Sequence, residues 1–262
     1  MKDVPGAGVS RLQRVRLHCV LLVILALCGC TSTDTRGISE WLSHEPYAAV
    51  RTYRPPPPAR YLVLLLSGDG GWGAPLSEIA RRLSAQGALV AGVDVRDLFA
   101  VYSRDPHGCV SPGADLAALA RYLQQRYALA GAPVVLIGHS AGATLAYVAL
   151  VQSTPGTFAG ALTLSFCADL DLEKPLCGGP GLRSAPRTGG VQLLPATSPL
   201  PAPWFALHGL DDQVCPAAEA REFVSVMPGT HFLDLPGISH SYHHMSCWWP
   251  MFETAWHQLT AP

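Results

Sequence analysis

Short runs of apolar residues alternate with longer amphipathic segments along most of the chain. The apolar runs are bounded by Gly, Ser or Asp and occupy the ranges Tyr61–Leu66, Leu89–Val95, Val134–Ile137, Leu162–Phe166, Trp204–His208 and His231–Leu235. Residues that are apolar at successive positions are typical of strands buried on both faces of a parallel sheet. One more strand is expected at Ala48–Tyr53, before a stiff run of four prolines at 55–58.

The segments between these runs have helical periodicity. The predicted helices span Leu76–Gln86, Ala114–Ala128, Ala141–Ser153, Ala217–Met227 and Trp248–Leu259. Strands that alternate with helices indicate an α/β fold with a mostly parallel sheet, and such sheets bind ligands at the carboxyl ends of their strands. The Gly-, Pro- and Ser-rich segment before Trp204 shows little helical periodicity, so we expect little or no cap domain.

The loop after the Val134–Ile137 run carries the strongest chemical signal. It reads Gly138-His139-Ser140-Ala141-Gly142, and G-x-S-x-G at a strand-to-helix turn is the nucleophile elbow of the α/β-hydrolase fold. Glycines are needed because side chains two residues on either side of the serine would collide with neighbouring backbone. The N-terminus of the following helix favours developing negative charge. Ser140 is the candidate nucleophile, and an idle serine in a Gly-rich turn is the alternative.

A serine nucleophile needs a base, and the base needs an orienting acid; in this fold the chain order is Ser, acid, His. The loop after the Trp204–His208 run resembles the acid loop of α/β-hydrolases, and its register selects Asp212. Its neighbour Asp211 is the main competitor. Asp169 or Asp171, after the preceding strand, would be an alternative acid position, and ordinary turn chemistry or helix capping would also explain an aspartate pair.

His240 is the candidate base because it follows the last predicted strand within a few residues. His231 opens that strand and so lies at its wrong end, whereas His243 and His244 are interpreted as surface residues or substrate contacts. A His-rich run also suggests a metal. No carboxylate or cysteine spacing supports one, so we predict neither a metal nor a cofactor.

The loop after the Tyr61–Leu66 run is expected to complete an oxyanion hole. It reads Ser67-Gly68-Asp69-Gly70-Gly71-Trp72, and its glycines would let backbone N–H groups point into the site. We expect the N–H groups of Asp69 and Ala141 to bind the oxyanion. The Asp69 carboxylate would bind a cationic part of the substrate or cap the next helix. Trp72 would flank the cleft or simply pack. A phosphate-binding loop is the alternative, but no GK[ST] motif is present.

The N-terminal residues have the pattern of an export signal. Leu17–Leu27 is apolar, too short to span a bilayer, and preceded by basic residues, as in secretion signals. The sequence before Cys30 resembles the lipobox of bacterial lipoproteins, and Cys30 fits better than Cys28 because Leu27 is bulky. We therefore predict a signal peptide over 1–29, a lipidated tether over 30–47 and an α/β-hydrolase domain over 48–262. An ordinary cleaved signal or an uncleaved anchor is the alternative.

The cysteines predict disulfides, and the composition and charge exclude two classes of protein. An exported chain enters an oxidising compartment, where disulfides form. The disulfides we favour are Cys167 with Cys177 and Cys215 with Cys247, which leaves Cys109 unpaired in this prediction. Sequence alone does not decide the pairing. Hydrophobic residues make up 49% of the chain and its net charge is −1, which excludes an intrinsically disordered chain. With lysine only at positions 2 and 174, no basic stripe exists for nucleic acid.

Six motifs together resemble the bacterial VirJ/AcvB virulence-protein family. They are LSGDGGW at 66–72, GVDVRDLF at 92–99, the GHSAG elbow, SFCADLDL at 165–172, HGLDDQVCP at 208–216 and PGTHF at 228–232. The likeness covers roughly residues 48–259, and LSGDGGW is its more specific motif. The resemblance implies an exported serine hydrolase with Ser140, Asp212 and His240 as its triad.

The resemblance also implies a substrate, since relatives hydrolyse aminoacyl-phosphatidylglycerol, a membrane lipid. It implies a periplasmic location, and Thr31 after the lipidated cysteine favours the outer membrane. Two other functions remain open. One is a non-catalytic interaction or chaperone protein with a secretion-system partner, as the link of the family to virulence suggests. The other is a generic esterase or thioesterase.

Overall fold

The computed structural model describes residues 40–261, and the elements of this part form an α/β structure around one large sheet. The predicted signal peptide, Cys28, Cys30 and most of the predicted tether lie outside the described residues. Among the residues described, no helix is both long enough and apolar enough to cross a bilayer.

The large sheet has eight strands in the order β1-β2-β4-β3-β5-β6-β10-β11. The strands are β1 (Glu40–His44), β2 (Tyr47–Tyr53), β3 (Tyr61–Leu66), β4 (Ala88–Val93), β5 (Val134–His139), β6 (Gly160–Leu164), β10 (Trp204–Gly209) and β11 (Thr230–Leu235). β1 pairs antiparallel with β2 and β2 antiparallel with β4, whereas all the following pairs are parallel. This is the mostly parallel sheet that the apolar runs predict. β1 lies inside the range 30–47 that we assigned to the tether, so the folded part includes residues before 48.

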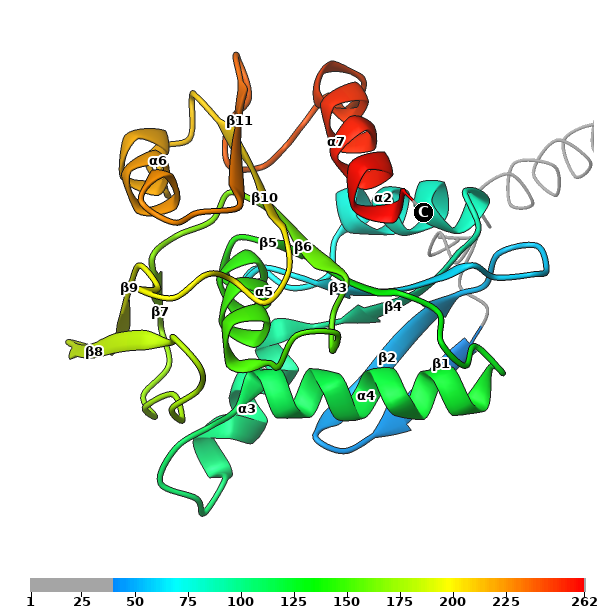
Figure 1. The fold of residues 1–262 in the computed structure, drawn as a ribbon, viewed down its shortest axis with the longest axis horizontal. Coiled ribbons are helices and arrows are strands. Elements are labelled where there is room, and N and C mark those ends of the chain that lie inside the picture. The colour runs from blue at the N-terminus through cyan, green and yellow to red at the C-terminus, as the bar shows by residue number, and fades with distance from the viewer. Residues whose placement is uncertain (1–39, 262) are drawn as a thin grey trace, which may run out of the picture. The chain divides into compact units, whose positions relative to one another are not determined.

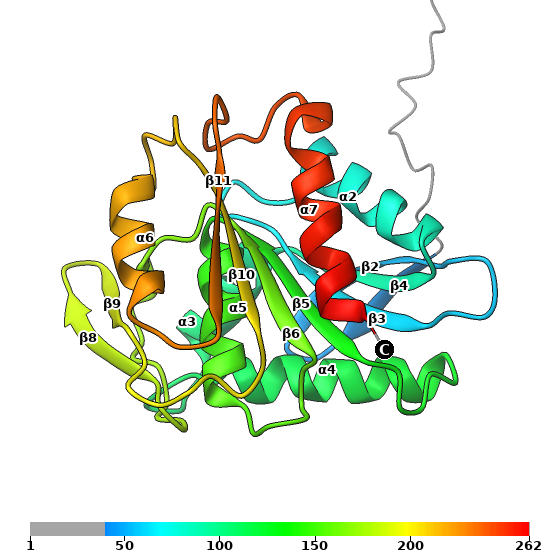
Figure 2. The ribbon, with the colours of Figure 1, turned by 45° about the horizontal axis from the view of Figure 1, so that its top comes forward.

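Helices cover both faces of this sheet (Figures 1 and 2). α2 (Ala74–Ala85) and α7 (Met245–Thr260) pack on one face, and α3 (Val95–Arg104), α4 (Pro112–Arg126), α5 (Ala141–Gln152) and α6 (Ala217–Ser225) pack on the other. The strands alternate between the two cores: Leu62 and Leu64 of β3 belong to the α5 side, and Val63 and Leu65 belong to the α7 side. Because both faces are covered, the central strands β3 and β4 are apolar at every position.

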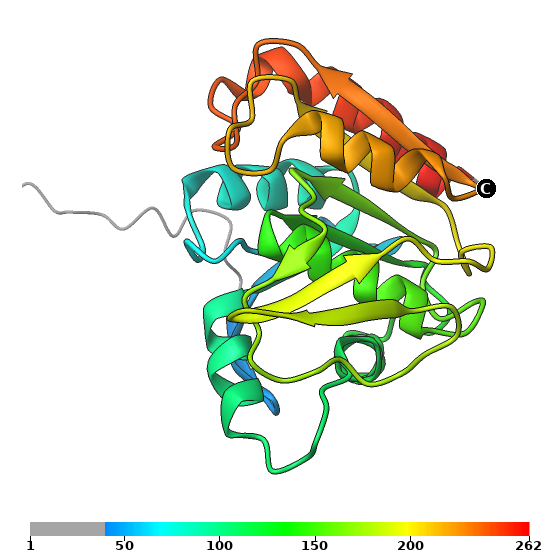
Figure 3. The ribbon, with the colours of Figure 1, turned by 90° about the vertical axis from the view of Figure 1, so that its left-hand side faces the viewer.

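Two further elements of the described chain differ from the sequence-based prediction. Val95 opens helix α3 rather than ending a strand, because the Asp94 carboxylate accepts the Arg96 N–H and caps the helix. The segment before Trp204 holds a three-stranded antiparallel sheet in the order β7-β9-β8 (Figure 3). Its strands are β7 (Asp169–Leu170), β8 (Arg183–Arg187) and β9 (Gly190–Leu194). Their short, mixed sequences lack the periodicity that identifies a strand, and no helix lies among them.

Candidate active site

Ser140 lies at the sharp turn between β5 and α5. Its backbone is left-handed, with φ 55° and ψ −125°, a conformation that costs free energy in a residue other than glycine. A Cβ on Gly138 would lie 2.1 Å from the Gly142 carbonyl oxygen, and one on Gly142 would lie 2.2 Å from that of Ser67. Both glycines are therefore required sterically, as the pentapeptide predicts.

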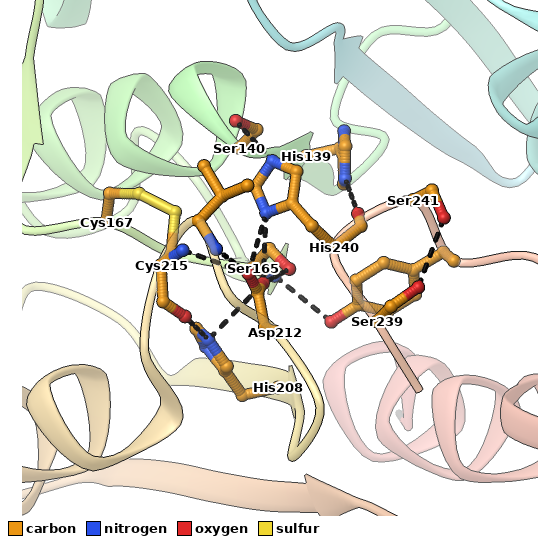
Figure 4. Close-up of polar contacts among 12 residues, drawn as sticks. His139, Ser140, Ser165, Cys167, His208, Asp212, Cys215, Ser239, His240 and Ser241 are labelled. Carbon is orange, nitrogen blue, oxygen red and sulfur yellow. Dashed lines mark hydrogen bonds and ion pairs between the residues drawn. A yellow bond between two sulfur atoms is a disulfide. The ribbon is translucent and has the colours of Figure 1, made fainter. Parts of the chain in front are cut away.

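His240 bridges Ser140 and Asp212 (Figure 4). His240 Nε2 lies 3.0 Å from Ser140 Oγ, and Nδ1 lies 3.1 and 3.0 Å from the two Asp212 carboxylate oxygens. These residues come from the loops after β5, β11 and β10, which open at the same edge of the sheet because the strands are parallel. The structure thus brings together the three residues that the sequence selects from distant loops.

The Asp212 carboxylate is buried and strongly hydrogen-bonded. Its Oδ1 accepts the N–H groups of Val214 and Cys215, both at 2.9 Å, and its Oδ2 accepts the hydroxyl of Ser165. Burial alone would raise the pKa of Asp212. The hydrogen bonds from His240, Ser165 and the two backbone amides outweigh burial and lower its pKa well below the ordinary value. Asp212 is therefore ionised and able to orient the His240 imidazole.

The competing residues lie elsewhere. Asp211 is exposed one position away, and Asp169 and Asp171 both pair with Arg187 in the three-stranded sheet. His231 stacks on Phe205 within the strands, and His243 and His244 are exposed beyond the base. None of these groups makes a hydrogen bond to Ser140 or His240.

The loop before α2 approaches the elbow closely. A Cβ on Gly68 would lie 3.1 Å from the Ser140 Cβ, and Gly68 begins a turn closed by the Gly71 N–H at 2.9 Å. Asp69, next in this turn, is exposed, and its carboxylate accepts the Gly70 N–H. The Ala141 N–H belongs to the first turn of α5, where no helical carbonyl can accept it. Both amides predicted for the oxyanion hole therefore lie in the segments next to Ser140.

Trp72 takes the packing role, not the cleft position. Its indole lies directly over Gly92, where a Cβ would be 2.2 Å from the ring, and its Nε1–H donates to Ser77 Oγ at 2.9 Å. Its ring also stacks on Tyr53. Trp72 therefore anchors the turn to the sheet.

The disulfide prediction is wrong in both pairs. Cys109 bonds Cys177 and Cys167 bonds Cys215, while Cys247 is free and exposed. Cys167 follows β6 and Cys215 follows β10, and these strands are neighbours in the sheet. Loops at the same ends of neighbouring parallel strands meet, so the fold brings together cysteines that are 48 residues apart.

One group of donor atoms in the described part has metal-like spacing: Asp212, Cys215 and His240 offer atoms within 4.8 Å of one another. Cys215 is bonded to Cys167, so it supplies no thiolate, and His240 already contacts both Ser140 and Asp212. The donor chemistry of this group therefore does not fit a metal ion.

Three supporting residues were not identified from the sequence. His139 contacts the backbone oxygen of His240 through Nε2 at 2.7 Å, and burial lowers the pKa of His139. Ser165 donates to Asp212, and the Tyr242 hydroxyl accepts the Ser165 N–H at 3.1 Å. His139 lies inside the recognised pentapeptide, and Ser165 is the penultimate residue of the predicted strand Leu162–Phe166. Their positions next to the strand ends were therefore the available signal.

The sheet order and the elbow are those of the α/β-hydrolase fold. Solved structures agree: Thermogutta terrifontis esterase 2 phosphorylated by paraoxon is 15% identical, with a TM-score of 0.60, over 87% of this chain and 97% of that one. The esterase domain of a Rhodothermus marinus protein is 17% identical with a TM-score of 0.54, over 80% and 91%. Est1E from Butyrivibrio proteoclasticus is 13% identical with a TM-score of 0.53, over 82% and 98%.

The family is settled by the sequence itself. The profile described as "Bacterial virulence protein (VirJ)" matches residues 60–237, well over half of the chain. The protein therefore belongs to the VirJ family, as the six motifs indicate. No curated protein matches it.

Proposed function

We propose that the protein is a serine hydrolase of carboxylic esters in which Ser140 is the nucleophile, His240 the base and Asp212 the orienting acid. The observation that carries this proposal is the continuous contact from Ser140 Oγ through the His240 imidazole to the buried, ionised Asp212 carboxylate. Binding alone would need neither the left-handed serine nor this order of groups. The structural likeness to esterases supports the same class.

The reaction follows from the order of the three groups. His240 Nε2 takes the Ser140 hydroxyl proton as Oγ attacks the ester carbonyl, and the resulting imidazolium is stabilised by Asp212. The N–H groups of Asp69 and Ala141 hold the oxyanion. Nε2 then gives its proton to the leaving alcohol, and an acyl-enzyme forms. Water, deprotonated by the same nitrogen, then attacks the acyl carbon. The bond to Oγ breaks, the carboxylic acid is released, and Nε2 returns the proton to Ser140 Oγ.

The substrate we propose is aminoacyl-phosphatidylglycerol, whose ester links an amino acid to a lipid. Membership of the VirJ family supports this choice. The exposed Asp69 carboxylate next to Gly68 offers a partner for the ammonium group near the scissile carbonyl. The export signal predicted at the N-terminus and the lipobox-like sequence before Cys30 support a lipid anchor in the periplasm, on the outer membrane. A tethered enzyme would meet a membrane substrate at high effective concentration.

A direct experiment compares the wild-type protein with Ser140→Ala on aminoacyl-phosphatidylglycerol in vesicles and on p-nitrophenyl acetate. We expect the wild type to release the amino acid and Ser140→Ala to release none above background. Hydrolysis of the short ester alone would reduce the proposal to a generic esterase. No hydrolysis of either ester, together with equal retention of a secretion-system partner by both proteins, would favour the non-catalytic role.

Reaction with an organophosphate gives an independent test that needs no knowledge of the substrate. One structural neighbour is described as phosphorylated by paraoxon. If Ser140 is an activated nucleophile, paraoxon should phosphorylate this chain once. Ser140→Ala should remain unmodified. Asp211→Asn should react as the wild type does, because the Asp211 side chain is exposed and makes no hydrogen bond to Ser140 or His240.

A further inference from the structure

We propose that Ser165, fixed by Tyr242, is a positioning residue that holds the Asp212 carboxylate in register with His240. The inference rests on the proposed function. Ser165 lies in the loop after β6. This loop is distinct from the three loops that supply Ser140, His240 and Asp212. Among the described residues, two side chains donate hydrogen bonds to Asp212: His240 and Ser165.

The two carboxylate oxygens of Asp212 are held by different groups. Oδ1 accepts two backbone N–H groups, from Val214 and Cys215, both at 2.9 Å, which come from its own loop. Oδ2 accepts Ser165 Oγ and lies 3.0 Å from His240 Nδ1. Without Ser165, the oxygen closest to the imidazole would keep no donor besides His240. Rotation of the carboxylate about its Cβ–Cγ bond would then be opposed only by the two amides on Oδ1 and by His240.

The neighbouring histidine cannot replace Ser165. His208 Nε2 lies 3.7 Å from Asp212 Oδ2, but it contacts the Cys215 carbonyl oxygen at 2.7 Å. His208 is buried, and burial lowers its pKa, so it is neutral at physiological pH. A neutral ring committed to a backbone oxygen offers Asp212 no second proton.

Ser165 is itself fixed by the loop that carries the base. Its N–H donates to the Tyr242 hydroxyl at 3.1 Å, and that hydroxyl donates to the Leu207 carbonyl oxygen at 2.8 Å. Ser165 is buried and left-handed, with φ 53°, a conformation that persists only where the surroundings enforce it. Since Tyr242 follows His240 by two residues, one chain of hydrogen bonds joins the base loop to the acid.

The position of Ser165 suggests how to remove its hydroxyl cleanly. Glycine adopts a positive φ without strain, so Ser165→Gly deletes the hydroxyl and leaves the backbone relaxed. Thr would add a branched Cβ at a buried, left-handed residue and is unsuitable as a conservative variant. Tyr242→Phe removes the hydroxyl that fixes Ser165 and leaves the ring in place.

The experiment is a double-mutant cycle on the full chain, with hydrolysis of p-nitrophenyl acetate and covalent labelling of Ser140 by a fluorophosphonate as readouts. We expect Ser165→Gly to lower kcat and the labelling rate about tenfold to a hundredfold, the range for a hydrogen bond to a charged group, with KM within about twofold. In the Asp212→Ala background, the same substitution should change either rate by less than about twofold, because the group it acts through is gone. Tyr242→Phe should lower kcat by a smaller factor.

The possible failures are distinguishable. A wild-type protein that neither hydrolyses the ester nor is labelled at Ser140 overturns the proposed function. If the wild type is active, and Ser165→Gly and Tyr242→Phe both retain its rates, the proposed role of Ser165 is overturned. Equal losses with and without Asp212 would reduce Ser165 to a structural residue. Should Ser165→Gly fail to fold, the cycle of Tyr242→Phe with Asp212→Ala decides among the same outcomes.

Discussion

The nucleophile side and the acid side of the site are built by different means. Ser140 is held by backbone packing: Gly138 and Gly142 let three segments of main chain approach within distances that any side chain would prevent. Asp212 is held by two backbone amides of its own loop and, in addition, by a side chain and a covalent bond from the β6 loop: the Ser165 hydroxyl and the Cys167–Cys215 disulfide. A site with these two kinds of support should respond differently when each is removed.

The acid itself should show the largest effect. Asp212→Asn removes the charge that stabilises the imidazolium, and its amide favours the wrong His240 tautomer, so kcat should fall about 10⁴-fold. Asp211→Asn is the matched control, because that side chain is exposed and does not contact His240; its kcat should stay within about twofold. Steady-state kinetics of both variants check the assignment. Comparable losses in the two variants would contradict it.

A single methyl group added at Gly142 should disrupt the nucleophile elbow. Gly142→Ala places a Cβ 2.2 Å from the Ser67 carbonyl oxygen and 2.6 Å from that of Leu66. Backbone must move, so the free energy of unfolding should fall by roughly 3 kcal/mol and ester hydrolysis should be largely lost. Gly108→Ala, which meets nothing within 4 Å, is the control and should unfold with the wild type in urea. A fully stable, active Gly142→Ala protein would show that the elbow tolerates a side chain.

The two disulfides separate support of the site from support of the fold. Their sequence separations are similar, 48 and 68 residues, so removing either pair by Cys→Ala should lower the free energy of unfolding by roughly 2–4 kcal/mol. Only the Cys167 and Cys215 pair joins the acid loop, and its loss alone should lower kcat several-fold. Urea unfolding and kinetics on the two double variants measure both effects. Equal losses of kcat in the two double variants would show that the Cys167–Cys215 disulfide supports the site no more than the Cys109–Cys177 disulfide does.

Asp212 should also give a small pH dependence of stability. Its pKa is lowered in the folded protein, so the unfolded chain binds the proton first as the pH falls. The stabilisation is therefore complete above about pH 5. It begins to fall near pH 4, where the unfolded chain takes up the proton, and is lost as the pH approaches the lowered pKa of the folded protein, on the order of 2 kcal/mol in all. Unfolding of the wild type and Asp212→Asn between pH 6 and 3 should show a stability difference that shrinks with acid. A constant difference would contradict the ionised state.

The same contrast explains what the sequence could and could not predict. The elbow could be predicted because its glycines are required within five consecutive residues. The strands and their mostly parallel arrangement could be predicted from short, continuous apolar runs. Asp212 and His240 could be placed by their register after a strand. Ser165 and the partner of Cys215 depend on β6 and β10 being neighbours, which spacing along the chain does not reveal. The β7–β9 sheet was missed because its strands, as short as two residues, carry no periodicity.

Covalent labelling followed by peptide mass spectrometry tests the central claim most directly. A fluorophosphonate should add one phosphonyl group to the peptide that contains Ser140 in the wild type, and His240→Ala should slow this reaction by several orders of magnitude at an unchanged fold. An adduct on Ser165, Ser239 or another serine, or labelling of Ser140 that is indifferent to His240, would contradict the triad.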